Sequence, residues 1–312
     1  MAKKRPYRFF LYLAVRLAGL PFYGLPRGLA LFLGRCLGEV AFIMISRQRE
    51  NTLRHLRLAF GDEKTPGEIR KIARGVFRHG AETAVDVLRL SRLRGRPIEK
   101  IVETGNAFDV YRGLLQEGKG LISVTAHMGN WELLAGVFGL SGFEGAVIAR
   151  RVYYEPYNRW IVNLRRSAGV ETIYREQAAR GIFETLRRNQ VIGLLPDQDI
   201  ASQEGVFVKF LGRPAYTPVA PVKIALLTGA PLLPNFLLRE KRGRYRLLLG
   251  EVIRPRIETT REDALQKYTE AWMKQFEAVI RRWPDQWMWM HNRWKTQPSS
   301  VPSDGEELVI KE

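Results

Sequence analysis

The stretch LISVTAHMGNWELLAG, residues 121–136, joins a strand pattern to a helix pattern. Its first part is a short apolar run, which is typical of a buried strand, and the run ends at His127. Asn130 is a residue type that caps helices, so we expect a helix to begin beside it, with Glu132 in the first turn. The stretch therefore predicts a strand, a tight loop and a helix, with a histidine where the strand ends.

Strand and helix patterns alternate after this unit. GAVIAR, VETIY and QVIGLLPDQD are short strand candidates, and EPYNRWIVNLRRSAG and EQAARGIFETLRRNQ are the helical patterns between them. Such alternation is typical of a parallel sheet with helices on its faces. Before this unit, TPGEIRKIARGVFRHGAETAVDVLRL predicts one or two amphipathic helices with a Thr-Pro start signal. After it, PLLPNFLLREKRGRYRLLLGEVI predicts a hairpin that turns at 241–243, and EDALQKYTEAWMKQFEAVIRRWP predicts a long helix.

Composition limits the classes of protein to which the chain can belong. The 312 residues contain no internal repeat, which favours one domain with additions. Lys and Arg number 50 against 32 Asp and Glu, and the formal charge of +18 predicts an anionic partner. Cys36 is the single cysteine, so no internal disulfide can form, and a reducing compartment is the simpler expectation.

The first 46 residues predict a membrane anchor. They hold a basic cluster, a largely apolar run from Phe9 to Leu25, and a second apolar run, GLALFLGRCLGEVAFIMI. Neither run reaches the ~20 uninterrupted apolar residues of a secure transmembrane helix. Two core helices of a soluble protein are the alternative. Basic flanks and terminal aromatic residues favour an anchor, either single-span or interfacial.

His127 and Glu132 suggest general-base chemistry at the end of the strand. Ligands gather beyond the carboxyl ends of strands in open α/β sheets. A carboxylate on the next helical turn can fix the tautomer of the imidazole and stabilise its protonated form. A structural histidine and a glutamate favoured by the helix dipole are the alternative reading.

Other chemistries lack their signatures. The chain has no G-x-S-x-G elbow, no H-E-x-x-H pair and no G-x-G-x-x-G after a strand. Gly113, Gly118 and Lys119 fit the spacing of a phosphate-binding loop, but Gly120 replaces the required Ser or Thr, so we interpret these glycines as helix ends. A base without its own nucleophile or metal suggests activation of a substrate hydroxyl.

HMGNWE resembles the H-x4-D/E motif of glycerolipid acyltransferases, and the whole chain is similar to the bacterial lipid A biosynthesis (late) acyltransferase family. The similarity rests on SRQRENTLRHLRLAF, ARRVYYEPYNRWIVNLRRSAG, GLLPDQD, FLGRPAYTPVAPVKIALLTGAPLLP and WPDQWMWMHNRWK. The segment RRVYYEPYNRW departs from the commoner N-P-x-L-D form. The resemblance implies a glycerolipid acyltransferase-like fold: a mixed, largely parallel central sheet flanked by helices, with an N-terminal membrane-anchoring helical segment. Together with the sequence patterns, it divides the chain into an anchor at 1–46, an acyltransferase domain at 47–296 and a tail at 297–312 that we expect to be disordered.

The resemblance also implies a reaction. His127, paired with Glu132, would deprotonate a hydroxyl of a lipid A precursor, and the oxygen would attack the thioester of acyl carrier protein or acyl-CoA. Backbone N–H groups near Gly129, or an arginine, would stabilise the oxyanion. No cofactor or metal is expected. Candidate contacts to substrate are Arg150, Arg159, Arg166, Asn130, Asp197 and Gln198.

Both co-substrates are anionic, so the resemblance and the charge together place the enzyme on the cytoplasmic face of a bacterial inner membrane. Two alternatives stay open. One is a same-fold enzyme that acylates another glycolipid, such as a phosphatidylinositol mannoside. The other is a nucleic-acid-binding protein, against which the absence of a recognisable nucleic-acid module argues.

Overall fold

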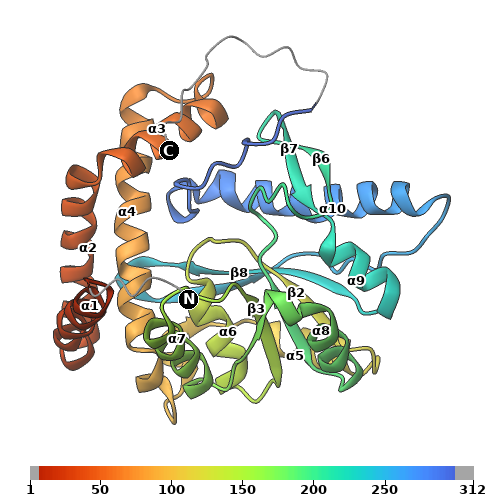
Figure 1. Ribbon diagram of the computed structural model, residues 1–312, viewed down its shortest axis with the longest axis horizontal. Coiled ribbons are helices and arrows are strands. Elements are labelled where there is room, and N and C mark those ends of the chain that lie inside the picture. Colours follow the sequence, from red (N-terminus) through yellow and green to blue (C-terminus); the bar gives the residue numbers. More distant parts are fainter. Residues whose placement is uncertain (1–6, 299–312) are drawn as a thin grey trace.

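The computed structural model describes residues 7–298 of the chain, without the side chains of Leu11 and Gln177. Helices α1 to α4 stand at one end of the molecule, and α9 lies toward the other, with the sheet between them (Figure 1). The helices are α1 Tyr7–Gly24, α2 Arg27–Met44, α3 Ser46–Phe60, α4 Pro66–Leu88, α5 Ala107–Leu115, α6 Trp131–Leu140, α7 Glu155–Ser167, α8 Ala178–Arg187, α9 Ala220–Thr228 and α10 Arg261–Arg282. The strands are β1 Val102–Glu103, β2 Leu121–Val124, β3 Gly145–Ala149, β4 Glu171–Tyr174, β5 Val191–Leu194, β6 Gly205–Phe210, β7 Arg213–Pro218, β8 Leu232–Arg239 and β9 Tyr245–Leu249.

The central sheet has seven strands in the order β1-β9-β8-β2-β5-β3-β4. The five strands from β8 to β4 are mutually parallel, and β9 runs antiparallel to β8. All four residues of β2 are buried, as are all eight of β8, because helices cover both faces of the sheet there. The predicted mixed, largely parallel sheet flanked by helices is confirmed.

Two apolar cores lie on opposite faces of this sheet. Helices α5 and α6 contribute to one core, which includes Tyr111, Leu133 and Phe138. Helices α4, α8, α9 and α10 contribute to the other, larger core, which includes Phe276 and Trp289. Parallel strands joined by helices place every strand's carboxyl end at one edge, so β2 and β5 end side by side.

Local signals located most elements correctly. Thr65 caps α4 through a capping box with Glu68, and the 65–90 pattern forms one helix rather than two. The 241–243 turn joins β8 to β9 as expected. Gly118 and Gly120 follow α5 with φ of +73° and +70°, which agrees with helix termination. The β6–β7 hairpin and the short β1 were not predicted.

Helices α1 and α2 leave many apolar side chains exposed. Helix α2 packs on α4 through Gly34 and Gly38, where an added Cβ would lie within 2.8 Å and 2.7 Å of α4 atoms. Its other side exposes large side chains, among them Phe32 at 59% and Ile43 at 67%. Across residues 7–298, no single helix has the length and apolarity to span a membrane, although α2 and α3 together, bent by 89°, meet that test of length and composition. The predicted anchor therefore stays a prediction, and residues 1–6 and 299–312 of the predicted anchor and tail lie outside the described part of the chain.

Candidate active site

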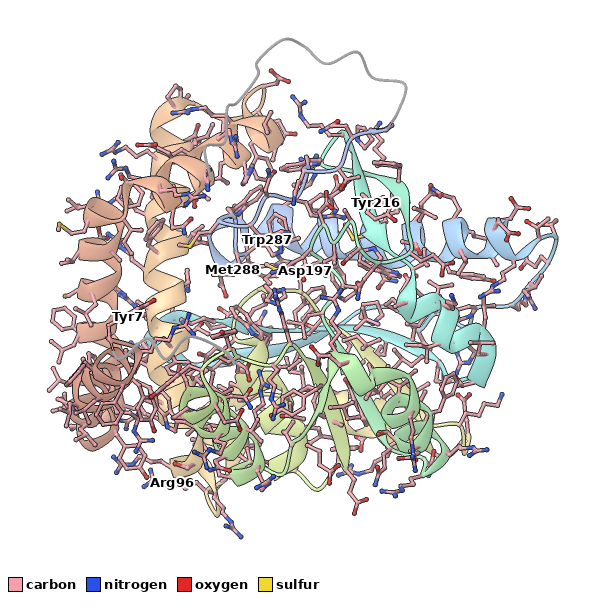
Figure 2. All side chains as sticks on the ribbon, in the orientation of Figure 1. Tyr7, Arg96, Asp197, Tyr216, Trp287 and Met288 are labelled. Carbon is pink, nitrogen blue, oxygen red and sulfur yellow. The ribbon has the colours of Figure 1, made fainter. Side chains whose placement is uncertain are left out.

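His127 lies at the carboxyl end of β2 and is held by Asp197, which follows β5. Its Nδ1 lies 2.7 Å from Asp197 Oδ1, and its backbone N–H donates to Asp197 Oδ2 at 2.8 Å. The indole N–H of Trp287 donates to the same Oδ2 at 2.9 Å. Asp197, Trp287 and Met288 lie together in the middle of the molecule (Figure 2). Because a carboxylate only accepts, Nδ1 carries the proton and Nε2 is left as the basic nitrogen.

Burial and charge act in opposite directions on this pair. Burial lowers the pKa of His127, but the charge and hydrogen bond of Asp197, helped by the charge of Glu132, raise that pKa above its ordinary value. Burial raises the pKa of Asp197, but His127 and Trp287 lower it below its ordinary value. Asp197 is therefore a buried carboxylate, 2% exposed, that stays charged because its partners donate to it.

Glu132 does not hold the imidazole in the predicted way, and this corrects the expected His127–Glu132 dyad. Its two carboxylate oxygens accept from Nε and Nη2 of Arg165 on α7, at 2.8 Å and 2.5 Å. Glu132 does sit in the first turn of α6, as predicted, and its charge acts on His127. The reason for the difference is that Asp197 already occupies Nδ1, while α7 brings a bidentate guanidinium to Glu132.

The loop after His127 is fixed by hydrogen bonds that also correct the prediction for Gly129. The Gly129 N–H donates to the carbonyl of Gln286 at 2.9 Å, so it is not free to stabilise an oxyanion. Gly129 has a φ of +59°, and an added Cβ would lie 2.1 Å from the Leu237 carbonyl oxygen. Thr83 Oγ1 donates to the Gly129 carbonyl at 3.0 Å, which ties the loop to α4.

Asn130 caps α6 as predicted and is fully buried, and its predicted contact with substrate stays a prediction. Its Oδ1 accepts from the Leu133 N–H and its Nδ2 donates to the Tyr245 hydroxyl, both at 2.9 Å. Tyr245 in turn donates to Asp86 at 2.6 Å, and Asp86 also accepts from Arg239. This buried network fixes the start of α6, and with it the position of Glu132.

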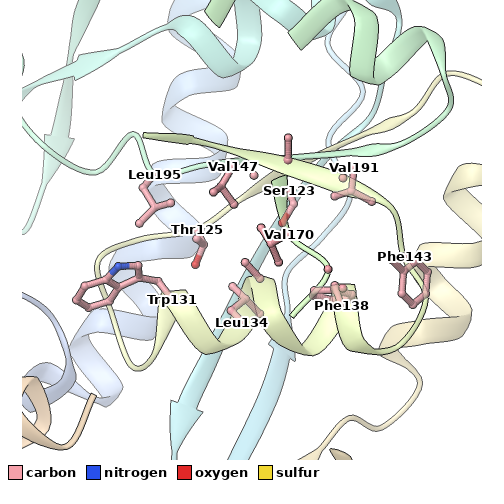
Figure 3. A pocket seen from close by; sticks show the side chains of 16 residues that line it. Ser123, Thr125, Trp131, Leu134, Phe138, Phe143, Val147, Val170, Val191 and Leu195 are labelled. Atoms are coloured by element: carbon pink, nitrogen blue, oxygen red, sulfur yellow. The ribbon is translucent and has the colours of Figure 1, made fainter. Parts of the chain in front are cut away.

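An apolar pocket is lined at one end by Trp131, the neighbour of the imidazole. It lies between α6 and strands β2, β3 and β5, and its empty volume is about 500 Å³, part of which is open to solvent. Trp131 and Phe143 lie at its opposite ends (Figure 3). The Trp131 ring is 5.3 Å from the His127 ring in an edge-on contact. A long apolar group lying in this pocket would therefore contact Trp131, whose ring is the neighbour of the His127 ring.

Comparison with known proteins agrees with the family resemblance of the sequence, and a family model covers nearly the whole chain. A family model described as "Bacterial lipid A biosynthesis acyltransferase" matches residues 3–296. The chain belongs to this acyltransferase family. It is 27% identical over 276 residues to the lipid A biosynthesis lauroyltransferase of Escherichia coli K12, covering 87% of each chain. It is 25% identical over 281 residues to the palmitoleoyltransferase of that organism, covering 88% of this chain and 87% of the relative. It is also 29% identical over 216 residues to the phosphatidylinositol mannoside acyltransferase of Mycobacterium tuberculosis H37Rv, covering 67% of this chain and 66% of the relative.

The other predicted contacts of the acyltransferase divide into two groups. Asp197, expected to bind substrate, holds the imidazole of His127. Arg150, Arg159 and Arg166 are exposed on β3's end and α7, and within residues 7–298 none forms an ion pair with a carboxylate. Gln198 is partly exposed beside Asp197. These four residues stay predictions, whereas Arg165, which the sequence analysis missed, is the arginine paired at the site.

The remaining histidines of the acyltransferase have structural partners. His55 Nδ1 lies 2.8 Å from the Trp289 carbonyl, His79 Nε2 lies 3.2 Å from Asp285, and His291 Nε2 accepts from the Asp199 N–H. In the described part of the chain, no group of three or more His, Cys, Asp or Glu side chains is arranged to hold a metal ion.

Proposed function

We propose that the chain is an O-acyltransferase that moves a fatty acyl chain from an acyl thioester to a hydroxyl of a lipid A precursor. The observation that carries this proposal is the His127–Asp197 pair, whose imidazole lies 5.3 Å, ring to ring, from Trp131 in the lining of an apolar pocket. A thioester of acyl carrier protein or coenzyme A is the proposed donor. The family match supports acyl transfer, and relatives named for two different glycolipids support a glycolipid acceptor.

The reaction that this geometry favours needs no covalent enzyme intermediate. Nε2 of His127 takes the proton of the acceptor hydroxyl while its oxygen bonds to the thioester carbonyl carbon. The tetrahedral intermediate then collapses, the C–S bond breaks, and the thiolate leaves with the proton from the imidazolium. Asp197 stabilises that imidazolium, and because it stays deprotonated it keeps the proton on Nδ1 throughout.

Arg165 is the proposed oxyanion donor in place of Gly129. Burial lowers the pKa of Arg165, but its bond to Glu132 raises that pKa above its ordinary value, so the guanidinium is always charged. Two of its N–H groups bind Glu132, and the guanidinium has five. Glu132 would thus position the oxyanion donor rather than the base, and its charge would also favour the imidazolium.

The apolar pocket is the proposed site for the acyl chain of the donor. Its lining is mostly apolar from Trp131 to Phe143, and burial of a chain there contributes about 0.8 kcal/mol per methylene. The exposed apolar faces of α1 and α2, together with the positive net charge, support docking at an anionic membrane surface. We therefore propose the cytoplasmic face of a bacterial inner membrane as its location.

The deciding experiment is mass spectrometry of lipid products from purified protein. The protein is incubated with a lipid A precursor and a mixture of acyl-carrier-protein and CoA thioesters. We expect one added acyl chain and no product with His127→Ala. A phosphatidylinositol mannoside acceptor tests the second candidate function, which the 29% identical relative supports. If wild-type protein modifies neither lipid with any donor, the proposed function is wrong.

A further inference from the structure

Aromatic and arginine side chains of α1 and α7 form a cluster that the reaction above does not use. The Cζ of Arg8 lies 4.3 Å from the ring centroid of Tyr153, and the Cζ of Arg16 lies 5.0 Å from that of Trp160. The Tyr12 ring lies 6.0 to 6.5 Å from three rings of the Tyr154–Trp160 segment. The aromatic–arginine cluster consists of Arg8, Tyr12, Arg16, Tyr153, Tyr154, Tyr157 and Trp160.

The cluster and His127 lie at the same edge of the sheet. Arg165 of α7 binds Glu132, and Trp160 precedes Arg165 by five residues, which is ~7.5 Å along the helix axis and ~140° around it. Helix α7 also follows β3, whose carboxyl end lies at the same edge of the sheet as His127. Two strand spacings separate β2 from β3, which is ~10 Å. A molecule that reacts at His127 can therefore reach the cluster.

The two segments that contain the cluster are rich in arginine. Helix α1 contains Arg8 and Arg16 and no Asp or Glu. The 150–166 segment contains five arginines and one carboxylate, Glu155, which lies 3.5 Å from Arg151. Guanidinium groups bind phosphate through paired N–H donors, and aromatic rings pack against the apolar C–H face of a sugar. The cluster thus offers both kinds of contact that a phosphorylated sugar needs.

We propose that the aromatic–arginine cluster binds the phosphorylated saccharide headgroup of the acceptor lipid. This inference rests on the proposed function, because it makes the cluster the acceptor's binding site. A flat membrane surface fits the cluster less well, because Tyr12, Tyr154, Tyr157 and Trp160 are only partly exposed between α1 and α7. The outward side chains Phe10 and Met44, 67% and 74% exposed, suit a membrane better.

The test measures binding without catalysis. The full chain carrying His127→Ala is titrated with a bisphosphorylated glucosamine disaccharide lipid in neutral detergent micelles, and with the same lipid after phosphate removal. The test variant adds Arg8→Gln and Arg16→Gln, and the control adds Arg187→Gln and Arg188→Gln. The control loses the same charge at the end of α8, before β5 begins at the opposite edge of the sheet.

We expect the test variant to raise the Kd for the phosphorylated lipid about tenfold or more, and the control to leave it within about twofold. The dephosphorylated lipid should bind the test variant and the control equally. Trp160→Leu should weaken both lipids, because the ring contacts the sugar, and it supplies a test that leaves the arginines in place.

Three results would overturn the inference. The first is an unchanged Kd in the Arg8→Gln/Arg16→Gln variant, even if its melting temperature falls, which would make the cluster a fastening between α1 and α7. The second is that the Arg8→Gln/Arg16→Gln variant no longer sediments with phosphatidylglycerol vesicles while its Kd for the phosphorylated lipid is unchanged. The third is no binding of the phosphorylated lipid by the parent protein. Cluster-dependent binding without acyl transfer by wild-type protein would instead support this inference and reject the proposed reaction.

Discussion

Replacing Asp197 with Asn tests how the base is held, because the two residues have the same shape. Two donors, the Trp287 indole N–H at 2.9 Å and the His127 backbone N–H at 2.8 Å, converge on one oxygen of Asp197. An Asn amide keeps both hydrogen bonds only if its oxygen occupies the position of Asp197 Oδ2. Its NH2 group then faces Nδ1 of His127 and donates to it. The proton must move to Nε2, and the nitrogen that should accept from the substrate becomes a donor.

The size of the effect follows from counting these hydrogen bonds. The opposite amide orientation keeps the productive tautomer but makes only one of these three hydrogen bonds, and it sets the NH2 group against two donors. One buried hydrogen bond is worth about 1–3 kcal/mol, so the loss of two lowers the population of the productive tautomer to about one in 30 or less. The imidazolium also loses the carboxylate charge. We expect kcat for acyl transfer to fall on the order of 10²–10⁴-fold.

The pH profile gives an independent readout. Asp197 raises the pKa of His127 against the effect of burial, so wild-type activity should fall as the pH drops through a pKa above the ordinary histidine value. In Asp197→Asn, burial is the main remaining influence on the pKa of His127, so the acid limb of the pH–activity profile should move to lower pH. The carboxylate's contribution to stability, present above its ordinary pKa and lost as pH falls through its lowered folded pKa, should disappear as well.

The assay is steady-state acyl transfer at saturating acceptor, from pH 5 to 9, with thermal melting of each variant. Asp199→Asn is the matched control: Asp199 is 6% exposed and accepts from the N–H and hydroxyl of Thr296, at 2.7 Å and 2.8 Å, and the change should alter stability more than kcat. If Asp197→Asn keeps kcat within about threefold of wild type and its acid limb does not move, Asp197 does not position the base.

Three further predictions concern neighbouring parts of the site. Glu132→Gln leaves the largely buried guanidinium of Arg165 without its partner, so both activity and the melting temperature should fall, and adding Arg165→Met should restore stability but not activity. If the double variant is as active as wild type, the pair has no role in catalysis. Gly193 lines the pocket, and an added Cβ would lie 3.1 Å from Val147 Cγ1. Gly193→Ala should therefore lower kcat/KM for the longest donor chain about fourfold per excluded methylene, measured with a series of acyl thioesters of increasing length. An unchanged dependence of kcat/KM on chain length would place the acyl chain elsewhere. Asp86→Asn removes a buried charge that pairs with arginine side chains, so the free energy of unfolding in urea should fall by about 3–5 kcal/mol, and a loss below about 1 kcal/mol would show that the network does not hold this region together.

The sequence by itself determined the local units of the protein. The apolar run of β2, the Asn130 cap and the first turn of α6 are each set by residues a few positions apart, so the 121–136 stretch could be interpreted directly. The same holds for the Thr65 capping box and for the turn between β8 and β9. Parallel-sheet architecture followed from the alternation of such units, and His127 stood out because it ends a buried strand.

Only the tertiary structure decided which groups meet at His127. The sequence predicted Glu132, five residues away, as the partner of the imidazole. The imidazole instead binds Asp197, which is 70 residues away, because β2 and β5 are neighbours in the sheet. Strand order depends on long-range packing that no local pattern encodes. The pairing of Arg165 with Glu132 likewise needed α6 and α7 to be placed side by side.

The aromatic segment near the C-terminus shows the same division. Its tryptophans were recognisable in the sequence, but nothing local indicated that Trp287 would be 3% exposed and donate to Asp197. A buried carboxylate stays charged only if donors from several elements converge on it. Here the donors are His127, which follows the carboxyl end of β2, and Trp287 of this segment. Residue types and spacing identified His127 as the candidate base, whereas the packing of distant segments determines which groups set the tautomer and the pKa of its imidazole.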